Sequence, residues 1–452
     1  MERNKNRIIN RVVFAVLLIA ASAATLKLFH LQALGNPENY HSDVKAYILE
    51  MQGLESGYSF PYPVFFKLSA FMNLFAEPEL AVALAEMLLN SLGLLITKIA
   101  FDRLALQELE ASVETRRSSL RAAGRRPILQ SWMAGVAISV VVVTLFFISM
   151  LFPPEGYYLP GIKFLYLGVF TANPFHNATY MAARPFAILA FLWFARLMPV
   201  YEEGFAGRGT GGSGAARGVP LRDYLLFSVF LLLTTMTKPS YTIILVCSAG
   251  LLMLYRLVRS GFRNFRPTLW LGLCFIPTFI ELLYQFKGVF VPEEAGEEGG
   301  IGFTLGEIWR GCCDNIPLAI GLAVGFPILV LLLNYRELKK NSLYRLSWIN
   351  FCVGFATAFF LYEKGFRKPD FNFAWGYMYG IFFCHMGALL VLLKATAGLL
   401  AGTVPAGGAA SEGLRSKRIR AVGVILQWLA YLWHVACGFY YFGMMMRGEI
   451  YI

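Results

Sequence analysis

The chain carries too little charge for a soluble protein of its size. Charged residues make up only 15% of its 452 residues and hydrophobic residues 57%. A soluble globular protein has about 25% charged residues, because they cover its surface. Polar stretches such as 103–127 and 200–221 are too short and too polar to form a core of their own. The composition therefore predicts one polytopic membrane domain over residues 1–452.

The chain also lacks a cysteine framework and an internal repeat. Its seven cysteines include no Cys-x-x-Cys spacing, so they do not indicate a cysteine-based metal site. Most of them lie in apolar segments, where cysteine usually serves as a small hydrophobic residue. Since no inverted or parallel repeat is visible, the sequence shows no sign of the internal symmetry that many transporters have.

The net charge of +12 does not predict nucleic-acid binding, because the basic residues do not gather on one helix or patch. They recur in alternate loops, as the positive-inside rule predicts for cytoplasmic connections. The N-terminus is therefore expected inside the cell and the acidic run at 293–298 outside. The basic segments are residues 3–11, 116–126, 208–222, 256–266, 336–345 and 415–420.

Apolar runs of about 20 residues match a hydrocarbon core of about 30 Å. The first run, residues 8–30, has no clean small-x-small cleavage site, so it is expected to remain as a span. The sequence thus predicts an all-α integral membrane protein with about eleven transmembrane helices, in a range of about 9–13, and an outer C-terminus. The further spans are predicted near 79–101, 131–152, 177–198, 222–237, 240–258, 268–288, 316–333, 346–362, 373–396 and 420–443.

Residues 31–78 form the first predicted outer loop. Pro61 and Pro63 interrupt any helix there, and the apolar part, residues 64–75, is too short to cross a membrane. Interfacial helices along the bilayer are therefore expected. Residues 153–176 share this aromatic, interfacial character. Flexible cytoplasmic linkers are predicted near 103–127, 200–221 and 397–419.

The first candidate site is His41-Ser42-Asp43, just after the first span. Ser42 or Asp43 would also cap a helix that begins here, and this simpler interpretation stays open. His41 adds a group that titrates near neutral pH and can share a proton or a metal ion. Asp43 and His41 are therefore the candidate catalytic pair.

Two cations interrupt apolar segments. Arg184 lies about two turns inside a predicted span, where an unpaired guanidinium costs roughly 2.5 kcal/mol or more. It either extends to the outer headgroups or pairs with a phosphate or carboxylate. Lys238-Pro239 predicts two spans that meet at an outer turn, with the ammonium either solvated or directed into an outer cavity.

The remaining candidates come from two further outer segments. Residues 173–177 close the second outer loop and supply Asn173 and His176. Residues 363–372 carry Arg367 and Lys368 on the outer side, against the positive-inside trend, and lead to Trp375. A solvated loop is the simpler interpretation, and an anion site is the functional one.

These features resemble the GT-C superfamily of multispan membrane glycosyltransferases. The resemblance covers residues 8–260 and rests on Asp43, on the segment 57–63 and on Lys238-Pro239. It implies transfer of a sugar from a polyprenyl-phosphate donor to a cell-surface glycan or lipid acceptor, on the extracytoplasmic face of the cell membrane. The resemblance makes Asp43 the general base or a metal contact, and it assigns the donor phosphate to Arg or Lys.

The residues fit this chemistry, which needs a base, cations for the leaving phosphate, and restricted water. Trp375, with Tyr58 and Tyr62, could stack on a sugar ring. No Asp-x-Asp or Glu-x-Asp pair is present, since His41 stands two residues before Asp43. Dependence on a divalent metal such as Mg²⁺ or Mn²⁺ is therefore open, with His41 and Asp43 as its only candidate ligands. The substrate-binding candidates are Arg184, Lys238, His176, Arg367, Lys368, Asn173 and Trp375.

Other classes compete with this hypothesis. A transporter or a lipid or glycan flippase would use charges inside spans, such as Arg184, Lys238 and Glu281. A glycan polymerase or ligase would depend on Arg and His rather than on Asp43. A scaffold without chemistry is the third alternative.

Overall fold

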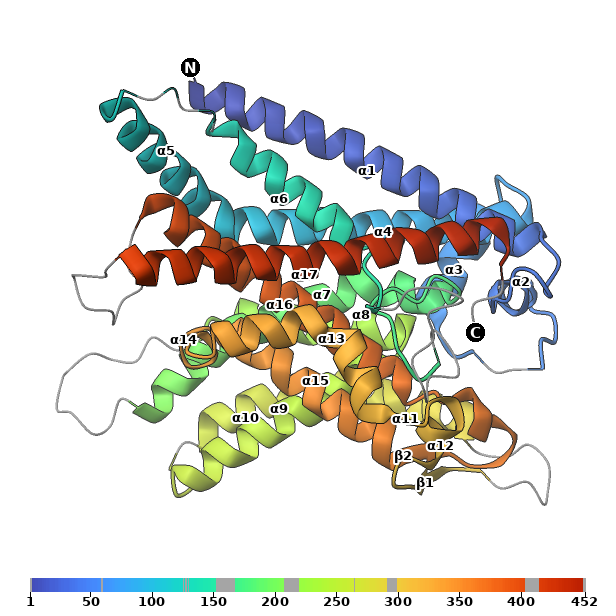
Figure 1. The fold of residues 1–452 in the computed structure, drawn as a ribbon. Coiled ribbons are helices and arrows are strands. Elements are labelled where there is room, and N and C mark those ends of the chain that lie inside the picture. The colour runs from blue at the N-terminus through green and yellow to red at the C-terminus, as the bar shows by residue number, and fades with distance from the viewer. Residues whose placement is uncertain are drawn as a thin grey trace.

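The computed structural model describes residues 2–57, 60–124, 126, 128, 130–151, 167–206, 219–263, 265–290, 299–402 and 414–449. Over these residues the chain is all-α, apart from one small antiparallel sheet (Figure 1). That sheet pairs β1 (Ile301–Phe303) with β2 (Leu361–Glu363). The predicted fold class, an all-α membrane protein, is therefore confirmed at the level of helical architecture.

A helix lies at each of the eleven predicted spans. Seven helical segments of the described chain are long and apolar enough to cross a membrane, or eight if the bent pair α10–α11 counts as one span. The total of about eleven stays a prediction, since α6 has 14 residues and α8 has 17. The helices are α1 (Glu2–Leu34), α4 (Pro78–Phe101), α6 (Trp132–Leu145), α7 (Ala178–Ala206), α8 (Leu221–Thr237), α9 (Ser240–Arg259), α10 (Phe265–Leu273), α11 (Ile276–Phe290), α13 (Ile316–Leu333), α15 (Ser342–Phe360), α16 (Ala374–Ala401) and α17 (Leu414–Arg447).

Local signals in the sequence fix several helix starts. Pro78 and Pro317 stand in the first turn of α4 and α13, where a missing N–H costs nothing. The Asn315 side chain accepts a hydrogen bond from Leu318 N, and Asn341 accepts one from Tyr344 N. Asparagine is one of the residues preferred at the N-cap, because its side-chain oxygen accepts from a free N–H of the first turn.

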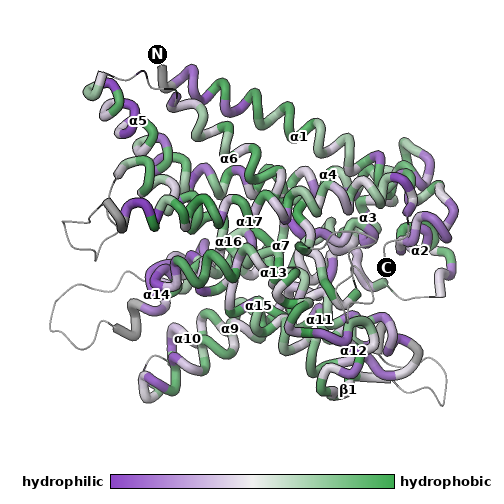
Figure 2. Tube along the Cα trace, in the orientation of Figure 1, coloured by the Kyte–Doolittle hydropathy of each residue, from purple (hydrophilic) through white to green (hydrophobic). Residues whose placement is uncertain are grey.

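The helix bundle has two ends. The described parts of the predicted inner loops lie at one end, and those of the predicted outer loops lie at the other. The start of α1, α5 (Gln107–Ala122) and α14 (Glu337–Lys340) lie at one end, on the left of Figure 1. The short helices α2 (Val44–Met51), α3 (Pro63–Met72) and α12 (Glu307–Cys312) lie at the other end with the sheet. Figure 2 shows hydrophilic residues at both ends and apolar stretches between them. The second end, which carries the predicted outer loops, is called the outer end below.

The first outer loop contains two short helices, α2 and α3, as expected between residues 31 and 78. Pro63 begins α3, and Phe65 and Phe66 on its inner face pack against Tyr47 of α2 at ring separations of 6.0 and 5.8 Å. Phe75, just after α3, is 77% exposed. An apolar ring in that position suits an interfacial location.

One predicted linker is helical. Residues 103–127 were expected to be flexible, but the π-helix η1 (Asp102–Leu106) joins α4 directly to α5, which continues to Ala122. The physical reason is a narrow apolar face, since Leu109 and Val113 of α5 are buried. In the linkers 200–221 and 397–419, residues 207–218 and 403–413 lie outside the described residues, and residues 200–206, 397–401 and 414–419 belong to α7, α16 and α17. Tyr58, the acidic run at 293–298 and most of the loop 153–176 also lie outside the described residues.

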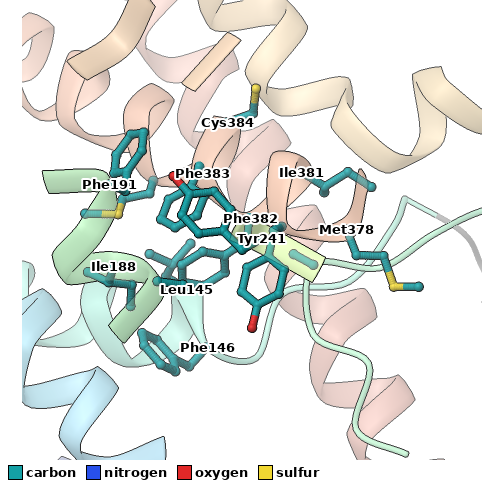
Figure 3. Packing of buried hydrophobic residues seen from close by; sticks show 14 of the residues in the cluster. Leu145, Phe146, Ile188, Phe191, Tyr241, Met378, Ile381, Phe382, Phe383 and Cys384 are labelled. Atoms are coloured by element: carbon teal, nitrogen blue, oxygen red, sulfur yellow. The ribbon is translucent and has the colours of Figure 1, made fainter. Parts of the chain in front are cut away.

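The core lies around α16, which is buried continuously from Ala374 to Leu393. Figure 3 shows Phe382 and Phe383 of α16 among side chains of α6, α7 and α9. Phe383 stacks on Phe191 with ring centres 4.2 Å apart, and Phe382 meets Phe146 edge to face at 5.6 Å. This core holds the outer ends of α7, α9 and α16 together, and the candidate site is built there.

Candidate functional site

Asp43 and Lys238 are joined by one side chain that the sequence analysis did not select. The Asn177 amide nitrogen donates to Asp43 Oδ2 at 2.7 Å. Lys238 Nζ donates to Asn177 Oδ1 at 3.1 Å and to Thr179 Oγ1 at 3.0 Å. Tyr47 completes the network, with its hydroxyl 3.1 Å from Asp43 Oδ2 and 3.0 Å from Thr179 Oγ1. A carboxylate and an ammonium from loops nearly 200 residues apart thus share one hydrogen-bonded cluster.

The start of α7 positions this cluster. Asn177 precedes the first helical residue, and its Oδ1 accepts from Tyr180 N at 2.9 Å, as an N-cap does. The same oxygen accepts from Lys238 and from the Thr179 hydroxyl at 3.0 Å. Three donors on Oδ1 leave the amide nitrogen facing Asp43. The orientation of the Asn177 amide therefore follows from its surroundings.

Lys238 owes its position to the turn between α8 and α9. Its backbone is extended, with φ −166° and ψ 123°, and Pro239 follows directly before α9. Proline restricts the preceding residue to this extended conformation. The break predicted from Lys238-Pro239 is therefore present, and it directs the side chain toward Asn177.

The two charged groups differ in exposure. Asp43 is exposed, whereas Lys238 is only 6% exposed. The ammonium lies 4.9 Å from the ring centre of Trp375 and 5.8 Å from that of Tyr62. Burial lowers the pKa of Lys238 to about 8, and the Asp43 carboxylate opposes this shift. Lys238 is thus a cation at neutral pH that loses its proton under mildly alkaline conditions.

His176 belongs to the cluster but is not a cation. Its ring packs 5.6 Å from Trp375, and the side chain is buried. Burial, with electrostatic repulsion from His41 and Lys238, lowers the pKa of His176 to about 3. A neutral imidazole does not neutralise the charge of a phosphate. His176 therefore contributes a neutral polar side chain to the lining of the cluster. His41 itself is exposed and lies in the electrostatic range of His176.

A second hydrogen-bonded chain supports Trp375. Its indole nitrogen donates to Asn372 Oδ1 at 3.1 Å, and the Asn372 amide donates to Glu363 Oε2 at 2.6 Å. Arg367 Nε lies 3.4 Å from Glu363 and 3.3 Å from Asp370. Burial raises the pKa of Glu363, and Arg367 opposes that shift. Arg367 and Trp375 therefore border the cluster, as two of the predicted binding residues.

Three other candidates, Lys368, Asn173 and Arg184, make no direct contact with this cluster among the contacts of the described residues. Lys368 pairs with Glu307 at 3.1 Å on the surface. Asn173 is buried, and its amide donates to the carbonyl oxygens of Leu145 and Ile148 at 3.1 and 2.8 Å. These bonds close the end of α6, so Asn173 has a structural explanation. Arg184 lies one to two turns into α7 and is fully buried.

The donor set at His41 and Asp43 does not fit a resident divalent metal. In the described part of the chain no group of three or more His, Cys, Asp or Glu side chains could hold a metal ion. Asp43 Oδ2 already accepts two hydrogen bonds, and the nearest charged neighbour across Asn177 is a cation.

Sequence reasoning missed Asn177, Thr179, Tyr47 and Glu363. Asn177 stands beside His176 at the start of a span, and an asparagine before an apolar helix is a recognisable cap. Nothing local marks Thr179 or Tyr47, because their roles depend on how α2, α7 and α9 meet.

Comparison with family models, curated proteins and solved structures gives no match to this chain. The GT-C resemblance accordingly stays a hypothesis about architecture. The site has an exposed carboxylate, a buried ammonium within two hydrogen bonds of it, and aromatic rings beside both. Such a site can accept a proton and stabilise a developing negative charge in one place.

Proposed function

We propose that this protein is a membrane glycosyltransferase that uses a polyprenyl-phosphate sugar as donor. The acceptor would be a cell-surface glycan or lipid, and the reaction would take place at the extracytoplasmic side of the cell membrane. The bridge from Asp43 through Asn177 to Lys238 is the observation that carries the proposal. It supports a base and a phosphate-binding cation in one site at the outer end of an apolar bundle.

The proposed reaction needs no group outside this cluster and the two substrates. The acceptor hydroxyl oxygen forms a bond to the anomeric carbon, and the bond from that carbon to the phosphate oxygen breaks. Asp43 takes the hydroxyl proton, and the polyprenyl phosphate leaves with the electron pair. Lys238, with Arg367 at the border of the site, stabilises the charge on the leaving phosphate. Trp375 and Tyr62 supply aromatic surface for a sugar ring.

The test is release of polyprenyl phosphate from lipid-linked sugar donors by the protein reconstituted in liposomes. Wild type is expected to release it in the presence of an acceptor, and Asp43→Asn is expected to bind donor but lose transfer by about 100-fold or more, since a general base contributes about that much. Equal thermal melting of the two proteins serves as the folding control. Full transfer by Asp43→Asn would remove the basis of the proposal.

A second candidate function is transport, and charged residues buried inside the bundle favour it. Glu86 and Arg184 are both fully buried within helices, as residues of a translocation pathway would be. Movement of an unmodified lipid-linked glycan across the membrane of protein-containing liposomes would support that alternative if Asp43→Asn left the rate unchanged. A polymerase or ligase would instead lose activity in Arg184→Gln while Asp43→Asn remained active.

A further inference from the structure

Below the outer cluster, two opposite charges lie in the interior of the bundle. Glu86 of α4 and Arg184 of α7 each have no exposed surface. Each lies in the electrostatic field of the other, yet no hydrogen bond joins them. Arg184 is charged at any accessible pH, so its burial has to be compensated.

Aromatic rings compensate Arg184 in part. Its guanidinium carbon lies 5.1 Å from the ring centres of Phe146 and Phe382 and 5.6 Å from that of Tyr180. Nη2 contacts the Met181 sulfur at 2.6 Å. Rings and sulfur are weak acceptors, and they leave the hydrogen-bonding capacity of Nε and Nη1 unused. Phe146 and Phe382 belong to the apolar core in Figure 3, so the guanidinium lies at the edge of that core.

The unpaired atoms are complementary. Arg184 Nε and Nη1 are donors, whereas Glu86 Oε1 and Oε2 are acceptors, and all four are buried without a hydrogen-bond partner in the protein. Asn90, one turn further along the same face of α4, adds an unpaired acceptor, Oδ1, while its amide donates to Thr25 at 3.1 Å. Buried polar groups of this kind are almost always satisfied, commonly by internal water.

We propose that Glu86 and Arg184 form an ionised pair bridged by internal water, a hydrated site beneath the outer cluster. Water is the ligand that fits, because one molecule both donates to a carboxylate and accepts from a guanidinium. The titratable neighbours are Tyr180 on α7 and Tyr379 on α16, whose hydroxyl donates to the Tyr180 carbonyl oxygen at 2.7 Å. The site is independent of the reaction proposed above.

The pairing is tested by a double-mutant cycle on thermal melting of the detergent-solubilised protein. Glu86→Gln and Arg184→Gln each leave one buried charge without its counter-ion, so each is expected to lower the melting temperature by about 5 °C or more. Glu86→Gln/Arg184→Gln removes both charges and is expected to recover most of that loss. An unchanged melting temperature of Glu86→Gln would overturn the pairing. It would mean that Glu86 is already neutral in the wild type, so that the substitution removes no charge.

The water is tested on wild type, which avoids the risk that a variant fails to fold. Water activated by an X-ray pulse oxidises side chains that it touches, including buried ones. Met181 contacts Arg184, and Met386 of α16 is an equally buried control, both with 0% exposure. Met181 is expected to be oxidised several-fold faster than Met386. Equal protection of the two methionines would overturn the hydrated site.

Discussion

Lys238 is held by two hydrogen-bond acceptors and covered by two aromatic rings, and this environment sets when it is charged. Because burial lowers its pKa to about 8, the ammonium is present below that pH and is lost above it. Any anion that Lys238 binds should therefore be released as the pH rises through about 8. Under the proposed function, Lys238 would therefore act as a phosphate ligand only on the acidic side of that value.

We expect donor binding to weaken across pH 7–9 with a midpoint near 8, because the pKa of Lys238 is lowered to about 8 by burial. Lys238→Arg is the matched control, because a guanidinium stays charged over this range. Binding of a polyprenyl-phosphate sugar to the two proteins, followed by tryptophan fluorescence, would measure it. The same alkaline loss in Lys238→Arg would assign the titration to another group.

Asn177 should be the most sensitive neutral residue of the cluster. Asn177→Ala removes the N-cap of α7, worth about 1 kcal/mol, and leaves the buried Lys238 short of an acceptor, worth about 1–3 kcal/mol more. Thr179→Ala removes one Lys238 partner but keeps the cap. A larger loss of melting temperature in Asn177→Ala than in Thr179→Ala is expected, and the reverse order would contradict the bridging role.

The sequence indicated where charge would gather, but not which neutral side chains would join it. Asp43, Lys238 and Arg367 were marked by being polar at the ends of apolar runs. His176 was a substrate-binding candidate beside Arg184 and Lys238, yet its burial makes it neutral. Glu363 could not be identified in advance, because its position depends on the β1–β2 pairing between residues 58 or more positions apart. It reaches Trp375 only through Asn372.

At the scale of one element, α13 shows how this bundle tolerates a broken helix. The backbone departs from helical geometry at Val324, shortly before Pro327. The freed Leu322 carbonyl accepts from Leu151 N at 2.8 Å, and the freed Phe326 N–H donates to His434 Nε2 at 3.2 Å. Both backbone groups are thus satisfied by neighbours, which apolar surroundings require.

His434→Phe should destabilise the protein by about 1–3 kcal/mol, since the buried Phe326 N–H and the Ser149 carbonyl oxygen both lose their imidazole partner. His385→Phe is the matched control: that imidazole is also buried, but it contacts a carbonyl of its own helix, that of Ile381. Melting in detergent should fall clearly in the first variant and less in the second. Equal losses would mean that the kink does not depend on His434.

At the scale of the whole molecule, hydropathy and charge predicted the architecture well. The helix positions and the separation of the described loops to two ends follow from the pattern of hydropathy along the chain, because an apolar solvent imposes length and polarity on each helix. The number of spans stays a prediction. Short elements were harder to predict. The helical extension through η1 and α5 depends on a few buried apolar residues. They are hard to recognise in the sequence, because the segment around them is mostly polar.

The proposed function requires that the end of the bundle that carries Asp43 and Lys238 faces the extracytoplasmic side. The outer end and the opposite end each offer an exposed residue for labelling, Asn39 before the cluster and Ser118 on α5. Asn39→Cys and Ser118→Cys keep the cluster intact. Each can be treated with a membrane-impermeant maleimide in intact cells, and its labelled peptide measured by mass spectrometry.

If the cluster faces the extracytoplasmic side, Asn39→Cys is labelled in intact cells and Ser118→Cys only after permeabilisation. Labelling of position 118 alone in intact cells would place the cluster in the cytoplasm, and transfer from a lipid-linked donor at the outer face would then be contradicted.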